Sequence, residues 1–240
     1  MNLSCEISRE RALNCKMICE TTIARMKSKR RSKVETPAKS AELRKRVVRR
    51  LKRGFFERPT LVVARELLGK VLVRRIGTRK ISVRITETEA YIGEKDLASH
   101  ARFGKTKRNA VMYGPAGVWY PYFVYGMHWM LNVTTEQMEA PAAVLIRAGK
   151  LIEMDTALKG PGILAKALRV DGACYGKSAT SGDLYIEDRG DRPGKILRTP
   201  RIGIDYAGAY IGKLWRFVVP AEIPGAARTQ RLQKKIKIGG

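Results

Sequence analysis

The segment 83–133 holds the closely spaced Glu87 and Glu89, His100 and a run of tyrosines, the residue types of this chain best suited to chemistry. Glu87 and Glu89 follow a run of β-formers, in which successive side chains alternate between the two faces of a strand. We therefore expect Val83, Ile85, Glu87 and Glu89 to share one face, with roughly 7 Å between the two glutamate Cα atoms. A carboxylate that faces inward costs free energy unless it is partnered. One such carboxylate is the minimum needed to deprotonate a water.

A purely structural role for these side chains remains open. Both carboxylates could pair with basic neighbours such as Arg84 or Arg147. Tyr91 has the same parity as Glu89, which puts an aromatic ring beside that carboxylate. His100 lies in a glycine-flanked basic loop. A lone histidine is more often structural than catalytic, so the loop, rather than the histidine alone, makes His100 a candidate.

The stretch 118–133 predicts a β-hairpin of aromatic residues, broken at Tyr125-Gly126-Met127. Pro121 has no backbone N–H to donate to a neighbouring strand, so the first strand is expected at a sheet edge or a bulge. Core packing is the default for an aromatic stripe, but polar tips fit a closed core poorly. Aromatic walls suit a flat ring by stacking, and electron-rich rings favour a cationic one. The two faces of the first strand carry Tyr120, Tyr122 and Val124 on one side and Trp119, Phe123 and Tyr125 on the other.

The remaining pattern predicts two helices and several strands. Pro59 and Thr60 begin one helix, which ends at Gly69, and Gly160-Pro161-Gly162 begins another that runs to Leu168. Because strands outnumber helices and occur in hairpins, the fold class is α+β with a largely antiparallel sheet. Besides the hairpin, strands are expected at 71–75, 81–89, 142–147, 183–187 and 215–219.

The charge balance is unusual, with 48 Lys and Arg against 22 Asp and Glu and a net charge of +26. Residues 1–53 carry a net charge of +12 and residues 223–240 carry +5. We interpret these segments as a flexible basic N-terminal arm and a basic C-terminal tail on a folded domain, 54–222, that is itself basic. Charge of this sign attracts polyanions, and nucleic acid is the most abundant of these.

Cysteine spacing and hydropathy indicate whether the chain binds a metal, crosses a membrane or is secreted. The four cysteines match no zinc pattern and indicate reduced thiols. We expect no metal and no cofactor. No apolar run approaches the ~18 residues of a membrane span, and no secretion signal is visible. We therefore expect the chain in the cytoplasm at the nucleoid, or in the nucleus of a eukaryote.

Several separate motifs follow one another in a fixed order between Arg58 and Val219. They are ITETEAYIG with the following His-Ala-Arg, TKRN, the YPYFVYGM hairpin that leads to Asn132, VLIRA, the GPG helix, SGDLYIED and RIGIDYAG…WRFVV. Together they resemble the alkyladenine (3-methyladenine) DNA glycosylase family. The resemblance implies a single α+β domain with a curved antiparallel sheet, a protruding hairpin and flanking helices. It also implies a monomer that acts on double-stranded DNA containing damaged purines, without a metal or a lyase step.

The same resemblance implies roles for individual residues. Glu89 corresponds to the general base that activates water, and Arg147 helps to hold both. Asn132 corresponds to a gate that hinders the 2-amino group of guanine. The base pocket would comprise Tyr91, His100, Tyr122 and Asn132, and the contacts to DNA would come from Tyr125 in the gap left by the flipped nucleotide, Met127, and the basic residues Arg102, Lys105 and Arg108.

Two other classes remain open from the residues alone. A carbohydrate-active glycosidase could use Glu87 and Glu89 as an acid–base pair, but adjacent positions on one strand do not flank a sugar. A non-enzymatic, ribosomal-type nucleic-acid-binding protein explains the charge but gives the buried carboxylate and the aromatic hairpin no purpose.

Overall fold

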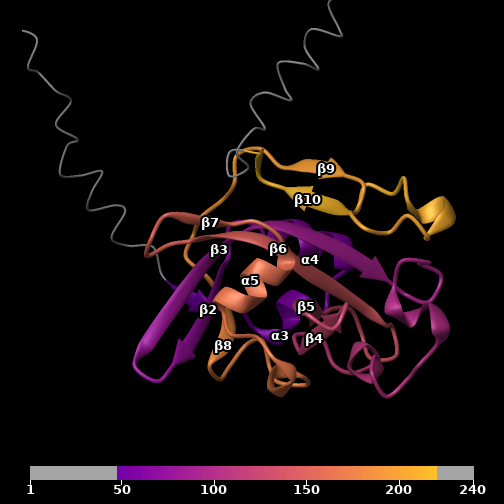
Figure 1. Cartoon of the computed structure of the whole chain (residues 1–240), viewed down its shortest axis with the longest axis horizontal. Coiled ribbons are helices and arrows are strands. Elements are labelled where there is room, and N and C mark those ends of the chain that lie inside the picture. Colours follow the sequence, from indigo (N-terminus) through magenta and orange to yellow (C-terminus); the bar gives the residue numbers. More distant parts are fainter. Residues whose placement is uncertain (1–47, 221–240) are drawn as a thin grey trace, which may run out of the picture. The chain divides into compact units, whose positions relative to one another are not determined.

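Strands that pair antiparallel throughout form one curved sheet in residues 48–220, the part of the chain that the computed structural model describes (Figure 1). The strands are β1 (Arg49–Arg50), β2 (Val71–Ile76), β3 (Arg79–Ile92), β4 (Trp119–Val124), β5 (His128–Thr134), β6 (Ala142–Leu151), β7 (Thr156–Leu158), β8 (Leu184–Asp188), β9 (Leu197–Thr199) and β10 (Arg216–Val218). Their main order is β1-β8-β2-β3-β6-β5-β4, while β10 pairs with both β3 and β9, and β7 pairs with β6. The α+β class with a largely antiparallel sheet is confirmed.

Short helices flank the sheet. They are α3 (Arg53–Phe56), α4 (Thr60–Glu66) and α5 (Pro161–Ala167), with the 3-10 helices η1 (His100–Phe103), η2 (Ala110–Tyr113), η3 (Gly172–Cys174) and η4 (Gly208–Tyr210). Both predicted helices are present, and Gly69 turns the chain after α4 with φ +83°. The predicted strands are present as well. Three short strands, β1, β7 and β9, and the one-turn helix α3 were not predicted, because two to four residues show no periodicity.

The predicted arm and tail extend beyond the described residues, since residues 1–47 and 221–240 lie outside them. The last residues assigned to the arm belong to the fold. Arg49 and Arg50 pair with Asp188 and Glu187 of β8, and Arg53 begins α3.

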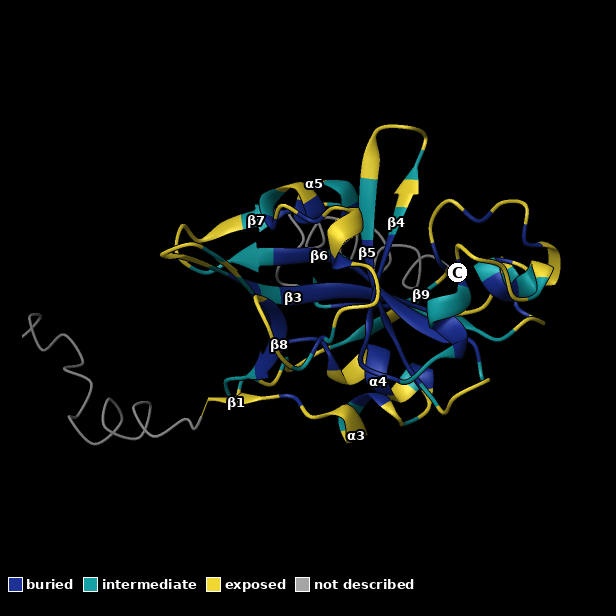
Figure 2. Cartoon of the chain, turned by 90° about the horizontal axis from the view of Figure 1, so that it is seen from below, coloured by how far each residue is buried: buried dark blue, intermediate teal, exposed yellow. Residues whose placement is uncertain are grey.

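The hairpin of β4 and β5 protrudes from one side of the domain, while α3 and α4 lie on the opposite side (Figure 2). β4 is the last strand of the main order, which places Pro121 on an edge strand as expected. In the turn, Tyr125 and Gly126 both have positive φ, at 53° and 64°, and the Met127 N–H donates to the Val124 carbonyl. The turn residues are exposed, so the hairpin presents its tip to the surroundings (Figure 2).

An irregularity in the β3–β6 pair decides which way the two glutamates face. Val83 and Ile85 pack in the main hydrophobic core. Ala90 packs there as well, although regular alternation along the strand would turn its side chain to the opposite face. The pairing register shifts between Ile85 and Thr88. Ile85 lies opposite Gly149, Glu87 lies opposite Ala148, and the next pair is Thr88 with Ile146. Each strand therefore carries one extra residue, Thr86 on β3 and Arg147 on β6.

The expectation that Glu87 and Glu89 share the face of Val83 and Ile85 is wrong for this reason. After the bulge, Thr88 and Ala90 occupy the core face, and the Thr88 hydroxyl donates to the Ala64 carbonyl of α4. Glu87, Glu89 and Tyr91 consequently point to the other face of the sheet, where the second half of the chain covers them.

The close approach of β3 and β6 beside the bulge requires glycine at position 149. A Cβ there would lie 2.8 Å from the Arg84 carbonyl oxygen and would collide with the Val83 side chain. Gly149→Ala should therefore cost about 1–3 kcal/mol of unfolding free energy, as overpacking does. Gly194→Ala is the matched control, because a Cβ at Gly194 has no atom within 4 Å. Chemical denaturation measures both, and equal stability of the two variants would contradict this packing.

Candidate active site

Glu89 is fully buried and accepts hydrogen bonds from three separate elements. Its Oε1 accepts from the Ile202 backbone N–H at 2.9 Å. Its Oε2 accepts from the Tyr91 hydroxyl at 2.8 Å and from Arg147 Nη1 at 3.3 Å. All three groups are donors, so they hold Glu89 as a hydrogen-bond acceptor in one fixed orientation. Burial and the neighbouring Glu89 carboxylate raise the pKa of Tyr91 well above its ordinary value, so its hydroxyl keeps the proton that it donates.

Glu87 has a different environment from Glu89. Its Oε1 accepts from Arg147 Nε at 3.0 Å and from Arg216 Nε of β10 at 2.6 Å. Arg147 thus bridges the two glutamates, as the pairing interpretation of the sequence anticipated. Because two guanidinium groups hold Glu87, it serves mainly to fix Arg147 beside Glu89.

Arg201 and Asp96 form a fully buried ion pair behind the Tyr91 ring, which the sequence gave no reason to expect. Arg201 Nη1 and Nη2 donate to the two Asp96 carboxylate oxygens at 2.6 Å and 2.8 Å, and Nη1 also donates to the Ala90 carbonyl. The Arg201 guanidinium lies 4.8 Å from the Tyr91 ring centroid. The pair therefore supports Tyr91 from behind and anchors the chain just before Ile202, which supplies a donor to Glu89.

Asn109 organises the loop that carries His100, and it was likewise not among the predicted site residues. Its side-chain amide donates to the carbonyls of His100 and Gly104, and its Oδ1 accepts from the Thr106 N–H at 2.7 Å. Asn109 is buried. The TKRN motif contains it, so the motif indicated its position but not its role.

His100 is held as a neutral ring against the hairpin. Its ring stacks on Tyr122 with centroids 3.7 Å apart and planes 24° apart, and its Nδ1 lies 3.0 Å from the Tyr120 hydroxyl. Burial, followed by the charges of Arg108 and Arg102, lowers the pKa of His100 to about 4. Burial also raises the pKa of Tyr120, so its hydroxyl stays protonated and the contact at Nδ1 joins two neutral groups.

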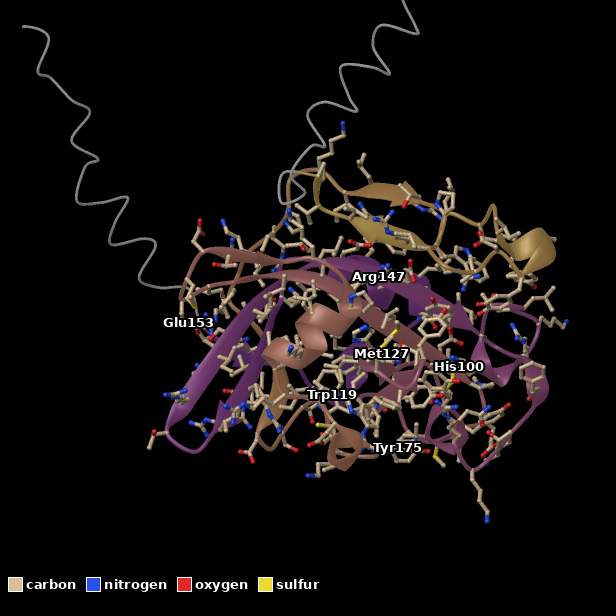
Figure 3. All side chains as sticks on the ribbon, viewed as in Figure 1. His100, Trp119, Met127, Arg147, Glu153 and Tyr175 are labelled. Atoms are coloured by element: carbon tan, nitrogen blue, oxygen red, sulfur yellow. The ribbon has the colours of Figure 1, made fainter. Side chains whose placement is uncertain are left out.

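A cavity of about 350 Å³ joins these residues. Tyr91, His100, Tyr122 and Asn132 all line it, so the structure brings the four predicted pocket residues together. Asn132 is buried, and its amide donates to the Tyr120 carbonyl at 3.0 Å. Arg147 lines the same cavity, with Glu89 covered just beneath it, and Figure 3 shows Arg147 and His100 reaching this region from β6 and η1.

The predicted DNA-contacting residues lie at different places around this cavity. Tyr125 is 85% exposed and stands at its rim, while Met127 is exposed on the same turn. Arg102 lies between the rings of Phe103 and Tyr206, at 4.4 Å and 4.6 Å. Arg108 lies 3.9 Å from the Tyr122 ring centroid and donates to the Phe123 carbonyl. Lys105 pairs with Glu139 at 3.1 Å, away from the cavity lining.

Two further properties of the described residues bear on function. Within residues 48–220, His, Cys, Asp and Glu side chains form no group of three that could hold a metal ion. No helix in that range is long and apolar enough to cross a membrane.

Comparison with known proteins identifies the chain. A family described as "Methylpurine-DNA glycosylase (MPG)" matches residues 54–223. A protein of Methanocella arvoryzae is 47% identical over 182 residues, covering 70% of this chain and 90% of the relative, and one of Legionella pneumophila (strain Lens) is 45% identical, covering 72% and 95%. A third, from Anaeromyxobacter sp., is 42% identical and is covered over its whole length. All three relatives bear the provisional name 3-methyladenine DNA glycosylase.

A buried carboxylate beneath an aromatic pocket, in a chain with these relatives, defines a DNA glycosylase. Within that class of enzyme the chain belongs to the methylpurine-DNA glycosylase family. The predicted family is thereby confirmed.

Removing one partner of the buried Asp96–Arg201 pair should be strongly destabilising. Asp96→Asn removes one partner and leaves a buried guanidinium without its carboxylate, which typically costs about 3–5 kcal/mol. Glu66→Gln is the matched control, because it breaks the exposed Arg58–Glu66 pair and should cost about 1 kcal/mol or less. Chemical denaturation of both variants gives the two values. A loss for Asp96→Asn as small as the control would contradict the role of this pair.

His100 should titrate with a midpoint near pH 4 in the folded protein, as followed by NMR of its ring. Because its pKa is lowered from 6.5 on folding, the unfolded chain binds a proton that the folded chain does not. The stability that the neutral ring provides is fully present above about pH 6.5 and is lost as the pH falls towards 4. The stability difference between the natural protein and His100→Gln should shrink over that window. A midpoint near 6.5 would contradict the buried, neutral ring.

Proposed function

We propose that this enzyme flips alkylated or deaminated purines out of duplex DNA and hydrolyses their N-glycosidic bond with a water activated by Glu89. Substrates of this kind include 3-methyladenine, hypoxanthine and ethenoadenine. The observation that carries the proposal is the fixed, buried Glu89 carboxylate beneath an aromatic cavity of about 350 Å³. The product is an abasic site.

The carboxylate suits this reaction for two reasons. Cleavage of the bond between base and deoxyribose passes through an oxocarbenium-like state, which a nearby anion stabilises. The same carboxylate accepts a proton from the attacking water. Glu89 Oε2 accepts hydrogen bonds from both Tyr91 and Arg147. A water that reaches Oε2 takes the place of the Tyr91 hydroxyl, and Arg147 remains in place to hold that water.

The aromatic cavity supports base flipping. A base inside the duplex is out of reach of Glu89 and must leave the stack, and aromatic walls offset part of the lost stacking. We assign Tyr91 to one wall and His100 with Tyr122 to the other. Asn132, buried at the cavity lining, acts as the gate against a 2-amino group.

The exposed hairpin turn supports a wedge role for its tip. Tyr125 is 85% exposed at the tip of the protruding hairpin, and insertion into the gap left by a flipped nucleotide gives its ring a use. Met127 presses on the neighbouring bases from the same turn. Arg102 and Lys105 contact phosphates, and we expect one chain to act on one duplex at the nucleoid.

The residues that line the cavity fit a reaction in which water, and not an amine of the protein, attacks the sugar. No lysine of the described residues lines it, so we find no amine placed to form a Schiff base with the sugar. The alternative of a carbohydrate glycosidase loses its acid–base pair, because Arg147 and Arg216 both hold Glu87.

Glu89→Gln should slow single-turnover release of hypoxanthine from a duplex about 10²–10⁴-fold while binding to that duplex persists, because the substitution removes the base and keeps the shape. Glu87→Gln is the matched control and should slow release less, since Glu87 acts through Arg147. Release is measured by alkaline cleavage of the abasic product. If Glu89→Gln released hypoxanthine at a near-normal rate, Glu89 would not be the base.

A further inference from the structure

Glu89 stands at the end of a row of four charged side chains that alternate in sign. Arg147 Nη1 donates to Glu89 Oε2 at 3.3 Å, and Arg147 Nε donates to Glu87 Oε1 at 3.0 Å. Arg216 Nε donates to the same Oε1 atom of Glu87 at 2.6 Å. All four side chains are at most 17% exposed. The two carboxylates are therefore balanced by guanidinium groups only when Arg216 is counted.

The pairing of β10 with β3 places Arg216 in this row. Arg216 lies directly opposite Glu89 in the register, so the two side chains occupy the same face of the sheet. From there the Arg216 guanidinium reaches Glu87, and its Nη1 donates to Thr199 Oγ1 of β9 at 3.0 Å. Glu87 and Thr199 thus hold the guanidinium at two points. Arg216 is not among the residues that line the cavity, so we expect it to act on a bound base through its neighbours.

Arg147 has to divide its donors between two glutamates. Its 3.3 Å contact with Glu89 is the longest of the three contacts in the row and therefore the weakest. Without Arg216, one guanidinium would face two carboxylates and leave one negative charge uncompensated. Glu87, left with Arg147 alone among the described residues, would draw it away from Glu89. The contact that the reaction needs is the one that would be lost.

We propose that Arg216 is a positioning residue for hydrolysis. By holding Glu87, it leaves the Nη1 group of Arg147 directed at Glu89 and at the attacking water. The proposal rests on the function proposed above for Glu89 and adds to it a residue outside the cavity. Arg216 itself contacts neither the base nor the water and transfers no proton.

Two simpler roles for Arg216 give different results. As a purely structural link between β10 and β3, Arg216 would affect the stability of the fold and not the rate of the folded enzyme. As a contact to DNA phosphates, it would affect binding and the salt dependence of binding. Only the positioning role makes the effect of Arg216 depend on the charge of Glu87.

The test is a double-mutant cycle with Glu87→Gln and Arg216→Gln. Single-turnover release of hypoxanthine from a duplex is measured at saturating enzyme, at a temperature where circular dichroism shows each variant to be folded. Binding to a duplex that contains an abasic-site analogue is measured alongside. Arg198→Gln is the matched control, because Arg198 is exposed on β9 and its replacement removes the same charge from the protein.

Arg216→Gln should slow release about 10- to 100-fold, since a misplacement of about 1 Å can cost 10²-fold. Adding Glu87→Gln to this variant should restore most of the lost rate, because one carboxylate and one guanidinium then remain. The double variant should therefore release hypoxanthine nearly as fast as Glu87→Gln alone. Arg216→Lys should have an intermediate rate, since it keeps the charge and loses the planar two-point contact. Arg198→Gln should leave the rate unchanged.

Other outcomes overturn the inference in distinguishable ways. A double variant slowed by the product of the two single losses would show that Arg216 acts independently of Glu87. A normal rate in folded Arg216→Gln would make Arg216 a structural link, and a loss confined to binding would make it a DNA contact. If Arg216→Gln does not fold, Arg216→Lys takes its place in the cycle.

The position of Arg147 gives a readout that needs no activity. In a crystal structure of Arg216→Gln, Arg147 Nη1 should have left Glu89 Oε2 and turned towards Glu87, and an unmoved Arg147 would contradict the inference. If the natural protein released no hypoxanthine, the glycosylase proposal would fail, and this structure would still decide whether Arg216 positions Arg147.

Discussion

The site depends on burying one carboxylate. An ionised side chain without partners is among the costliest groups to remove from water, so Glu89 is tenable only because Tyr91, Arg147 and the Ile202 N–H all donate to it. These donors come from β3, β6 and the segment before β10, which are far apart in the sequence. The requirement to satisfy this charge therefore ties three parts of the fold to one position.

The bulge in the β3–β6 pair makes that arrangement possible. Without it, Glu87 and Glu89 would continue the face of Val83 and Ile85 into the main core, where apolar side chains offer no donors. The matching irregularity on β6 turns Arg147 to the same side as the glutamates. Two shifts at one place keep the ladder intact on both sides and change the direction of the functional side chains.

Alternation, glycines and prolines predicted α4, α5, the aromatic hairpin and most strands, and the pairing of Glu89 with Tyr91 followed from their spacing alone. The bulge could not be predicted, because the sequence around Thr86 contains no glycine or proline to mark it. The Asp96–Arg201 pair was also missed, since it joins residues 105 positions apart. Asn109 illustrates a third limit, because a motif gives the position of a residue but not which backbone groups its side chain satisfies.

The central claim is that the cavity holds a flipped purine with its glycosidic bond facing Glu89. A crystal structure of the Glu89→Gln variant with a duplex containing hypoxanthine tests it most directly. The account predicts hypoxanthine in the cavity between Tyr91 and His100, Tyr125 in the gap of the helix, and residue 89 with Arg147 facing the sugar C1′ atom. Hypoxanthine stacked inside the duplex, or a C1′ atom on the far side of the cavity from residue 89, would contradict the account.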